Sequence, residues 1–301
     1  MTLVVGIDIG GTKTAAAVVD CDDGSVHEFL VKPTPASDGG KAVLLTAIQT
    51  AKSAIDTAGQ HVVACGIGTA GTITRQGVVS FATSSIDDWC GTDIATVVSI
   101  ELGLPVRVLN DVQAAALGES RYGAAAGFDN TLTVAIGTGV GGGFTQASTL
   151  AVGENGVAGS IGHLRVHATA PRRCACGGWG HLEAHVAGPA LEAQYATTTG
   201  EPSSLAEIAA RARAGEQAAE LVFNQAGSLL GEALAQAAVL LDPGVIVISG
   251  GVAATYDLLA GPLQEAFYAQ VFAGLNRIPI RVSELRARAT ILGAAAAASR
   301  P

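Results

Sequence analysis

The sequence predicts an α/β protein built from two related halves with a cleft between them. Short strands rich in β-branched residues alternate with segments of helical periodicity, which is typical of a sheet that is at least partly parallel. A strand, a glycine turn and a second strand occur twice, in "LVVGIDIGGTKTAAAVVD" and in "NTLTVAIGTGVGGGFTQ". With 49% hydrophobic and 14% charged residues among 301, the chain has ample material for a large core.

In the first half, the strand–turn–strand pattern is followed by alternating helices and strands. Apolar residues at helical spacing predict a helix over residues 40–58, and "VVACGIGTAG" is typical of a buried strand that runs into a glycine turn. "GTDIATVVSIELG" predicts a helix that stops at Gly103. The strand "PVRVLN" runs directly into the helix "DVQAAALGES", and we expect Asp111 to cap that helix, because Asn and Asp are favoured at helix starts.

The second half repeats this plan. "PGVIVISGGVAATYDLLAGPLQEAF" predicts a strand, a Gly-Gly turn and a helix, and "ATILGAAAAASR" predicts a helix of small residues that can pack closely on another helix. We therefore expect an N-terminal α/β domain of residues 1–118, completed by the C-terminal helix at 288–301. A larger α/β domain is expected over residues 119–287.

Charge and composition exclude several classes of protein. A net charge of −9 argues against sequence-independent nucleic-acid binding, which needs a basic surface. The five cysteines are too unevenly spaced for a disulfide framework. The first residues lack the features of a signal peptide, and no apolar run reaches about 18 residues. We expect a cytoplasmic protein that binds neither membranes nor nucleic acid.

The first glycine turn, "DIGGTK", is a candidate phosphate site. It places Asp8 at the end of a strand, and the next polar or flexible residues are Gly10, Gly11, Thr12 and Lys13. Glycines let backbone N–H groups approach an anion, and the hydroxyl and ammonium groups add donors. A tight hairpin that needs positive φ would use the same residues, so this stretch alone leaves both readings open. It is not a Walker A loop.

The second glycine turn, "GTGVGG" at residues 137–142, formally matches a dinucleotide-binding fingerprint. That fingerprint has to open a helix, whereas the residues that follow here predict a strand, so a dehydrogenase is disfavoured. Two glycine hairpins in two related halves instead suggest a nucleoside triphosphate held from both sides. Gly250 and Gly251, which precede a helix, form a third place where the backbone could approach a nucleotide.

The stretch "GHLRVHATAPRRCACGGWGHLEAH" contains a candidate zinc site. Cys174 and Cys176 form a C-x-C pair, with His163 upstream and His181 downstream. Thiolates and imidazoles at close spacing suit tetrahedral zinc, although two inert thiols in a glycine-rich loop would give the same pattern. Spare ligand candidates are His167 and His185. We favour a structural zinc ion that orders a loop with little apolar content.

Taken in order, these motifs resemble the ROK family (repressors, open reading frames and sugar kinases), which has the two-domain actin-like ATPase, or ribonuclease H-like, fold. The resemblance covers essentially the whole chain. The matching segments are "DIGGTK", "GIGTAG", "NDVQAAALGE", "GTGVGGG", "AGSIGH", "CACGGWGHLE" and "VISGG". It implies an ATP- and magnesium-dependent kinase that acts on a hexose-like substrate in the interdomain cleft, and it suggests a homodimer.

The same resemblance assigns roles to individual residues. Asp111 would be the general base that takes the proton from the attacking hydroxyl, and Asn110 would hold a neighbouring hydroxyl. His163 would be both a zinc ligand and a sugar contact, and Glu183 a further sugar contact. The other residues that would line the sugar site are Gly71 and Thr72. Those that would handle the phosphates, the metal and the nucleotide are Asp8, Gly10, Gly11, Thr12, Lys13, Thr138, Gly139, Gly250 and Gly251.

Three departures from the family pattern concern the zinc site and the substrate. The family's third cysteine is His181 here, and because histidine also binds zinc we predict a site of two Cys and two His. A glutamate that usually precedes "IGH" and contacts ring hydroxyls is Ser160, and an asparagine of the family's sugar site is Ser85. These changes favour an amino or N-acetylated hexose or a sugar-like cyclitol, without excluding glucose.

Other functions within the family are expected to fit less well. Its repressors carry an additional N-terminal helix-turn-helix domain, for which we expect no room before the first strand. A non-catalytic sugar-sensing protein is the main alternative, but a pure binder would not need the carboxylate of Asp111. The sequence leaves open whether ATP or polyphosphate is the phosphoryl donor.

Overall fold

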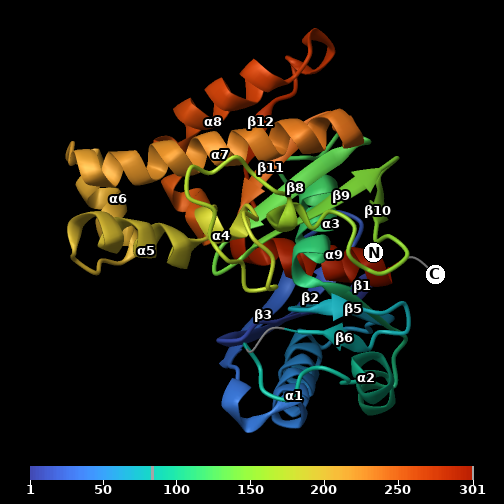
Figure 1. The fold of residues 1–301 in the computed structure, drawn as a ribbon. Coiled ribbons are helices and arrows are strands. Elements are labelled where there is room, and N and C mark those ends of the chain that lie inside the picture. The colour runs from blue at the N-terminus through green and yellow to red at the C-terminus, as the bar shows by residue number, and fades with distance from the viewer. Residues whose placement is uncertain (83–84, 300–301) are drawn as a thin grey trace. The chain divides into compact units, whose positions relative to one another are not determined.

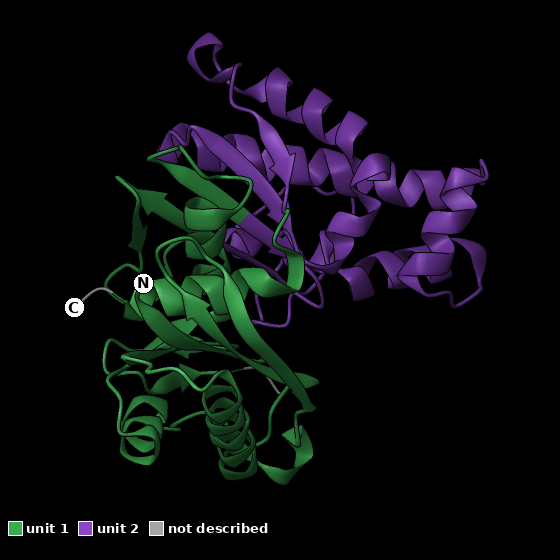
Figure 2. Cartoon of the chain, turned by 180° about the vertical axis from the view of Figure 1, so that it is seen from behind, with its two compact units in different colours: residues 1–133, 143–159, 284–301 green, residues 134–142, 160–283 purple. Residues whose placement is uncertain are grey.

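The chain forms two compact units, which Figure 2 shows in separate colours. The structure is a computed structural model that describes residues 1–82 and 85–299. The first unit contains residues 1–133, 143–159 and 284–301, and the second contains residues 134–142 and 160–283. The domain boundaries expected from the sequence stay predictions.

The first unit contains a five-stranded sheet with the strand order β3-β2-β1-β4-β7 (Figure 1). Its strands are β1 (Leu3–Ile9), β2 (Lys13–Asp20), β3 (Val26–Pro33), β4 (Ala64–Thr69) and β7 (Val106–Asn110). β1 pairs with β4 and β4 with β7 in parallel, whereas β2 pairs antiparallel with both β1 and β3. The expected partly parallel sheet is therefore confirmed.

Strand β1 separates two layers of the core, because successive side chains of a strand point to opposite faces. Val5 and Ile7 belong to a cluster that includes helix α1 (Gly40–Ala58), whereas Val4 belongs to a cluster with residues of α9 (Ala289–Ala298). The same alternation directs Asp8 toward the α9 face. Helix α1 has the bounds that its apolar spacing predicts.

Helix α2 (Ile94–Leu102) begins and ends at residues suited to helix termini. The carboxylate of Asp93 accepts a hydrogen bond from the Thr96 N–H at 3.1 Å, which satisfies one of the unpaired donors of the first turn. At the other end Gly103 adopts a left-handed conformation and its N–H donates to the Ser99 carbonyl. The predicted stop at Gly103 is therefore confirmed.

Helix α9 packs against α3 (Asp111–Tyr122) and against the central strands of the first sheet. Glycines permit this close approach. A Cβ atom added at Gly118 would lie 2.3 Å from the Ala289 carbonyl oxygen, and one at Gly293 would lie 1.7 Å from the Ala114 carbonyl oxygen. The predicted small-residue helix therefore packs closely on its neighbour, as expected. The last two residues of that prediction, 300–301, lie outside the described residues.

A second five-stranded sheet has the strand order β10-β9-β8-β11-β12. Its strands are β8 (Thr131–Ile136), β9 (Val140–Gln146), β10 (Thr149–Ala151), β11 (Val245–Ser249) and β12 (Ile280–Val282). β9 and β10 are antiparallel, and β11 and β12 are parallel. The second strand–glycine turn–strand pattern is confirmed as β8 and β9, so "GTGVGG" leads into a strand and not into the helix that a dinucleotide fingerprint needs.

The longest elements of the second unit are helices. They are α4 (Glu183–Val186), α5 (Gly188–Thr199), α6 (Leu205–Arg213), α7 (Gln217–Leu241) and α8 (Tyr256–Gln270). α7 and α8 lie side by side in Figure 1, and Gly227 and Gly231 of α7 approach the backbone of α8. Even the 25-residue α7 lacks the length of apolar sequence that a bilayer-spanning helix needs, and this holds for every helix among the described residues.

Short elements complete the chain. They are the strands β5 (Thr72–Ile73) and β6 (Val79–Phe81) and the 3-10 helices η1 (Ala36–Asp38), η2 (Ile161–His163), η3 (Gly251–Thr255), η4 (Ala273–Leu275) and η5 (Arg286–Arg288). Of these, the strand β5 and the helix η2 carry residues that the family resemblance places at the sugar site.

Candidate active site

The first glycine turn joins β1 to β2 in the first unit. The Gly10 N–H closes it by donating to the Lys13 carbonyl at 3.0 Å. Gly11 packs closely on Ser85, since an added Cβ would lie 3.0 Å from the Ser85 carbonyl oxygen. Neither Gly10 nor Gly11 has the positive φ that the tight-hairpin explanation requires. Thr12 and Lys13 are exposed, so their hydroxyl and ammonium groups are accessible to a ligand.

Asp8 lies near the end of β1, opposite Ala15 of β2 and Gly68 of β4. Burial, followed by the negative charge of Asp111, raises the pKa of the Asp8 carboxyl to about 7. Burial also raises the pKa of the Asp111 carboxyl, against the effect of its hydrogen bonds. A divalent cation would oppose both increases, and carboxylate oxygens are ligands that Mg²⁺ uses. The residues present therefore fit magnesium.

Asn110 and Asp111 lie where β7 runs into α3. Asn110 is the N-cap: its backbone is extended, and its Oδ1 accepts the N–H groups of Val112 and Gln113 at 3.0 and 3.2 Å. The expectation that Asp111 caps the helix is therefore wrong, because Asp111 is already helical and the preceding residue satisfies the first turn. Because Asn110 is the N-cap, the Asp111 carboxylate is available for another role.

Hydrogen bonds orient the Asp111 carboxylate. Its Oδ1 accepts the Asn110 side-chain amide at 2.9 Å and the Val112 N–H at 2.9 Å. Both bonds fall on the same oxygen, so Oδ2 is the oxygen left to take a proton. The Thr290 hydroxyl of α9 lies 3.5 Å from the Asp111 carbonyl oxygen. A partly buried, oriented carboxylate with a raised pKa has the chemistry of a general base.

Gly71 and Thr72 are brought beside this junction, since the Asn110 amide also donates to the Gly71 carbonyl at 3.0 Å. Gly71 has a φ of 107°, and an added Cβ would lie 2.7 Å from the Phe81 carbonyl oxygen, so the position requires glycine. Thr72 pairs with Phe81 across β5 and β6. The remaining predicted sugar residue of this unit, Ser85, lies beside Gly11 instead.

In the second unit, three segments meet at the second glycine turn. The Gly137 N–H donates to the Gly139 carbonyl at 2.8 Å, and the Gly137 carbonyl accepts the N–H of Gly188 at the start of α5 at 2.8 Å. Gly250 lies against the residue before the turn, because an added Cβ would be 2.4 Å from the Ile136 carbonyl oxygen. The predicted second and third nucleotide segments therefore adjoin one another.

Two other predicted nucleotide residues of this unit are open to a ligand. Thr138 is exposed at the tip of the second glycine turn. A Cβ added at Gly251 would meet no heavy atom within 4 Å. The region thus offers a hydroxyl and accessible backbone, which are the donors that bind phosphate and ribose groups.

Glu183 links the second glycine turn to the cysteine loop. Its Oε2 accepts the Val140 N–H at 2.9 Å, and its Oε1 accepts the Cys174 thiol at 3.4 Å. Gly139 leaves room for this carboxylate, because an added Cβ would lie 2.6 Å from Oε2. The sequence did not predict this positioning role, since Glu183 lies 43 residues from Val140 and only tertiary folding brings them together.

Ser160 and His163 lie at the two ends of η2 and are both exposed. The His163 N–H donates to the Ser160 carbonyl at 3.1 Å. Between them, Gly162 lies so close to β9 that an added Cβ would be 2.0 Å from the Val140 carbonyl oxygen. This contact holds both predicted sugar residues beside the second glycine turn while leaving their side chains accessible.

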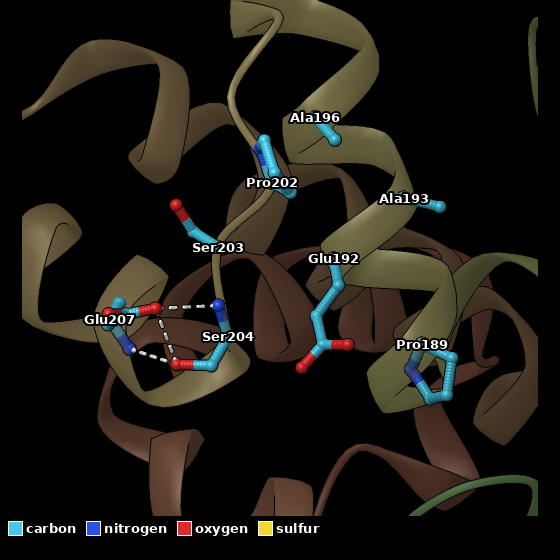
Figure 3. A pocket seen from close by; sticks show the side chains of 8 residues that line it. All are labelled: Pro189, Glu192, Ala193, Ala196, Pro202, Ser203, Ser204 and Glu207. Atoms are coloured by element: carbon cyan, nitrogen blue, oxygen red, sulfur yellow. Dashed lines mark hydrogen bonds between the residues drawn. The ribbon is translucent and has the colours of Figure 1, made fainter.

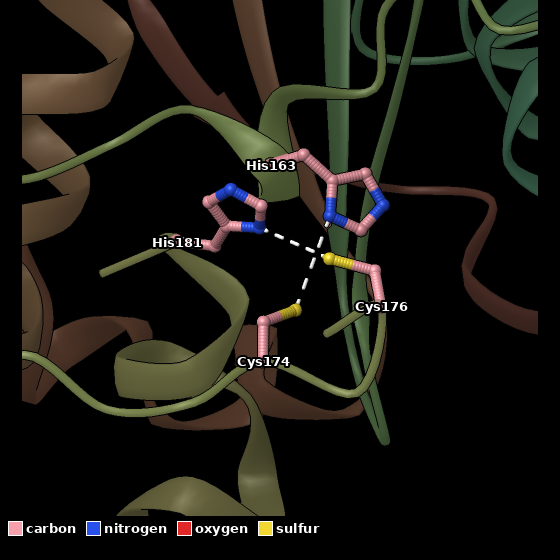
Figure 4. A group of neighbouring side chains, drawn as sticks. All are labelled: His163, Cys174, Cys176 and His181. Carbon is pink, nitrogen blue, oxygen red and sulfur yellow. Dashed lines mark hydrogen bonds between the residues drawn. The ribbon is translucent and has the colours of Figure 1, made fainter. Parts of the chain in front are cut away.

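The predicted zinc ligands form one cluster, and Figure 4 shows their four side chains directed at a common point. The ligand atoms of His163, Cys174, Cys176 and His181 all lie within 4.8 Å of one another. The Cys176 sulfur is 3.2 Å from His181 Nδ1, and the Cys174 sulfur is 4.0 Å from His163 Nδ1. Such separations suit four ligands that each reach a central zinc ion at about 2.0–2.3 Å.

The two spare histidines lie outside this cluster. His167 Nδ1 is 2.5 Å from the carboxylate of Glu232 on α7, which also accepts the His167 N–H. The His185 ring nitrogen Nε2 accepts the Arg172 N–H at 3.4 Å, and burial lowers the pKa of His185. These contacts give both histidines other roles, so the geometry selects the four-ligand set. Its donor atoms fit zinc.

Two cavities are lined by none of the predicted site residues. The first, about 550 Å³ in the second unit, lies between α5 and the start of α6 (Figure 3). Its lining residues are Pro189, Glu192, Ala193, Ala196, Pro202, Ser203, Ser204 and Glu207. The second, about 710 Å³, is bordered by residues of β7, α3 and α9 in the first unit. Cavity size alone therefore does not locate the chemistry.

Comparison with known proteins identifies the family. The model of the ROK family matches residues 4–300. A glucokinase from Streptomyces coelicolor is 32% identical and the match covers 100% of this chain and 99% of the relative. An N-acetylmannosamine kinase from Yersinia pseudotuberculosis is also 32% identical, over 97% of this chain and 96% of the relative. The chain belongs to the ROK family.

The fold expected from that family is also confirmed. The crystal structure of a ROK family glucokinase from Streptomyces griseus, in complex with glucose and AMPPNP, superimposes with a TM-score of 0.84. It is 32% identical, and the match covers 99% of this chain and 100% of that chain. The resemblance inferred from the glycine turns, the Asn-Asp junction and the cysteine loop therefore holds along the whole chain.

Proposed function

We propose that this chain is an ATP-dependent carbohydrate kinase, which transfers the γ-phosphoryl group to a hydroxyl of a hexose-like substrate. The observation that carries the proposal is the oriented Asp111 carboxylate in a chain that matches the ROK family over residues 4–300. Similar proteins that support it are a glucokinase, an N-acetylmannosamine kinase and a glucokinase crystallised with glucose and AMPPNP.

In the proposed reaction the Oδ2 atom of Asp111 takes the proton from the sugar hydroxyl that attacks the γ-phosphorus of ATP, and ADP is the leaving group. Asn110 fixes the Asp111 carboxylate through its amide and so sets the direction of proton transfer. Phosphoryl transfer relies on position and on charge neutralisation more than on covalent chemistry, so one well-placed carboxylate suffices. A bound Mg²⁺ ion would favour the negatively charged form of Asp111 that this step needs.

The glycine turns hold the phosphates in the proposed complex. The residues proposed to contact phosphates and metal are Asp8, Gly10, Gly11, Thr12, Lys13, Thr138 and Gly139, with Gly250 and Gly251 beside the nucleoside. Mg²⁺, when bound, would neutralise phosphate charge, and Asp8 is the carboxylate of the first turn that would hold it. Lys13 adds a positive charge, and backbone N–H groups of the turns supply further donors.

The serine at position 160 favours a proposed substrate other than plain glucose, without excluding glucose. The shorter, uncharged Ser160 leaves room and removes a carboxylate that would hold ring hydroxyls, and its side chain is exposed. An amino or N-acetylated hexose or a sugar-like cyclitol would use that room. The remaining proposed sugar contacts are Gly71, Thr72, Ser85, Asn110, His163 and Glu183.

A panel of sugars tests both the activity and this specificity. Purified protein with ATP and Mg²⁺ is assayed against glucose, mannose, amino hexoses, N-acetylated hexoses and cyclitols, with polyphosphate as the alternative donor. We expect turnover of at least one substrate and a gain of glucose activity in Ser160→Glu. Background turnover with every acceptor and donor would favour the alternative, a non-catalytic sugar-sensing protein.

We propose that the four-ligand cluster holds one structural zinc ion per chain. Metal analysis of the purified protein should find about one zinc, and Cys174→Ser should lose it together with thermal stability. Cys90→Ser is the matched control, because Cys90 is an exposed thiol outside the cluster. Wild-type protein that is stable and active without zinc would contradict this proposal.

A homodimer without nucleic-acid partners also stays a prediction.

A further inference from the structure

The loop of residues 152–159 in the first unit has no regular secondary structure and leads directly to Ser160. Three of its residues, Gly153, Gly156 and Gly159, have φ between 75° and 86°. Glycine is the residue that adopts this left-handed conformation without steric cost. Because glycines are flexible in the absence of contacts, something else has to hold the loop in one conformation.

Gln113 of α3 provides such a contact. Its side chain is only 3% exposed, and its amide Nε2 donates to the carbonyls of Gly156 and Ala158 at 3.2 and 3.4 Å. A buried amide group needs partners for its N–H donors, and the loop carbonyls need donors in turn. The two hydrogen bonds therefore tie the 152–159 loop to the first turn of α3.

Two further contacts locate the 152–159 loop. Gly156 lies against β5, because an added Cβ would be 2.6 Å from the Ile73 carbonyl oxygen and 3.6 Å from the Thr72 methyl group. On the exposed side, Arg75 and Glu154 form an ion pair at 2.7 Å, with both side chains more than 60% exposed. The loop is thus enclosed by α3 and β5, while its outer ion pair is solvated and weak.

The start of α3 consequently holds two loops with two side-chain amides. Asn110 donates to the Gly71 carbonyl of the loop before β5, and Gln113, three residues later, donates to the 152–159 loop. Asp111 lies between these two anchors, so the same turn of helix positions the proposed base and both loops.

We propose that Gln113 is a positioning residue for the sugar: it fixes the 152–159 loop and, through it, the segment that continues into Ser160. Gln113 makes no contact with the reacting atoms in this proposal. Its loss would loosen one wall of the sugar site and leave the base in place, so sugar affinity would fall more than the rate. This inference rests on the proposed kinase function.

Gln113→Met is the main test, because methionine has a similar length and volume but no donor. With the preferred sugar of the wild-type protein, the KM for sugar should rise about tenfold, the size expected when buried hydrogen-bond partners are lost. The kcat and the KM for ATP should stay within about twofold. Hydrogen exchange should become faster in residues 152–159 but not in α1.

Gln113→Glu is the second variant and serves if Gln113→Met does not fold. A protonated carboxyl group can donate one hydrogen bond to the loop, whereas a carboxylate can donate none. The ratio of its KM for sugar to that of the wild type should therefore increase with pH. Glu154→Gln is the matched control in the same loop, and its KM for sugar should stay within about twofold, since it breaks only the exposed ion pair.

The outcomes separate this inference from the proposed function. Wild-type protein that phosphorylates no sugar overturns the function and, with it, the role of Gln113. If the wild type is active, a folded Gln113 variant with an unchanged KM for sugar overturns the inference alone. An equal fall in kcat with no change in KM, or unchanged hydrogen exchange in residues 152–159, has the same consequence.

Discussion

Each of the two glycine turns joins one strand to the next, but the two turns differ in the charged residues around them. In the first turn the Gly10 N–H donates to the Lys13 carbonyl at 3.0 Å, and in the second the Gly137 N–H donates to the Gly139 carbonyl at 2.8 Å. The first turn has an aspartate two residues before Gly10 and a lysine at its end. The second has Ala135 at the position that corresponds to Asp8 and no charged residue between residues 134 and 146.

The second turn instead obtains its carboxylate from a distant part of the chain. Glu183 of α4 accepts the Val140 N–H, and the same side chain accepts the Cys174 thiol of the proposed zinc cluster. A repeated motif therefore need not carry a repeated function. The charged residues of the first turn are its own sequence neighbours. The second turn offers only backbone groups and small side chains, and its carboxylate comes from a residue that tertiary folding brings close.

The largest expected effect tests whether the acid–base chemistry belongs to the first unit. Asp111→Asn keeps the size of the side chain but removes the proposed base, so kcat should fall by about 10²–10⁴-fold with the fold retained. Steady-state kinetics and circular dichroism measure this. Glu101→Gln, an exposed change on α2 of the same unit, should leave kcat unaffected. Near-normal turnover of Asp111→Asn would show that the base lies elsewhere.

A smaller effect concerns the charge of the first turn without magnesium. The pKa of the Asp8 carboxyl is raised from 3.8 to about 7, so the folded protein keeps a proton that the unfolded chain releases. Its contribution to stability is complete below about pH 4 and is lost as the pH rises through about 7. The free energy of unfolding should therefore fall by roughly 2–4 kcal/mol over that interval from this group.

Urea unfolding at pH 5 and pH 8 without magnesium measures this loss. Asp8→Asn should remove most of the difference between the two pH values, and Mg²⁺ at pH 8 should stabilise the wild type but not the variant. Asp38→Asn, an exposed change in the same unit, is the control and should leave the difference unchanged. A wild type that is equally stable at both pH values would contradict the charge assigned to the first turn.

A third expected effect distinguishes glycines that pack against backbone from glycines that are open to a ligand in the second unit. Gly250→Ala places a Cβ 2.4 Å from the Ile136 carbonyl oxygen at a φ of 84°, so it should destabilise the protein by about 2–4 kcal/mol. Gly251→Ala meets no atom within 4 Å and should change stability by less than about 1 kcal/mol while raising the KM for ATP. Thermal unfolding and kinetics of both variants check this, and equal stability losses would be the contrary result.

The sequence predicted those elements whose formation depends on residues close together in the chain. Helix α1 and the stop of α2 at Gly103 follow from apolar spacing and from a glycine in the left-handed conformation. The edge strand β3 (Val26–Pro33) was not predicted, although its residues alternate between partly buried and exposed, because apolar and polar residues occur on both of its faces. The cap of α3 was assigned one residue too late, since both Asn110 and Asp111 are suitable residue types.

The candidate site shows the same limit. Spacing in the sequence indicated the cysteine loop but could not separate four ligands from six candidates. That choice depends on Glu232, which lies 65 residues beyond His167 and accepts its hydrogen bonds. The roles of Glu183 and Gln113 toward Val140 and Gly156 were likewise invisible, since each pairs with backbone 43 residues away.

The glycine contacts of α9 bear on the order in which the protein can fold during synthesis. Gly118 of α3 and Gly66 of β4 leave space that is filled by the backbone of residues 289–294. A ribosome has to make all of residues 160–283, most of the second unit, before that backbone exists. Synthesis of the first unit therefore begins before that of the second unit and ends after it. Until α9 emerges from the ribosome, the first unit exposes an apolar groove that a chaperone could cover.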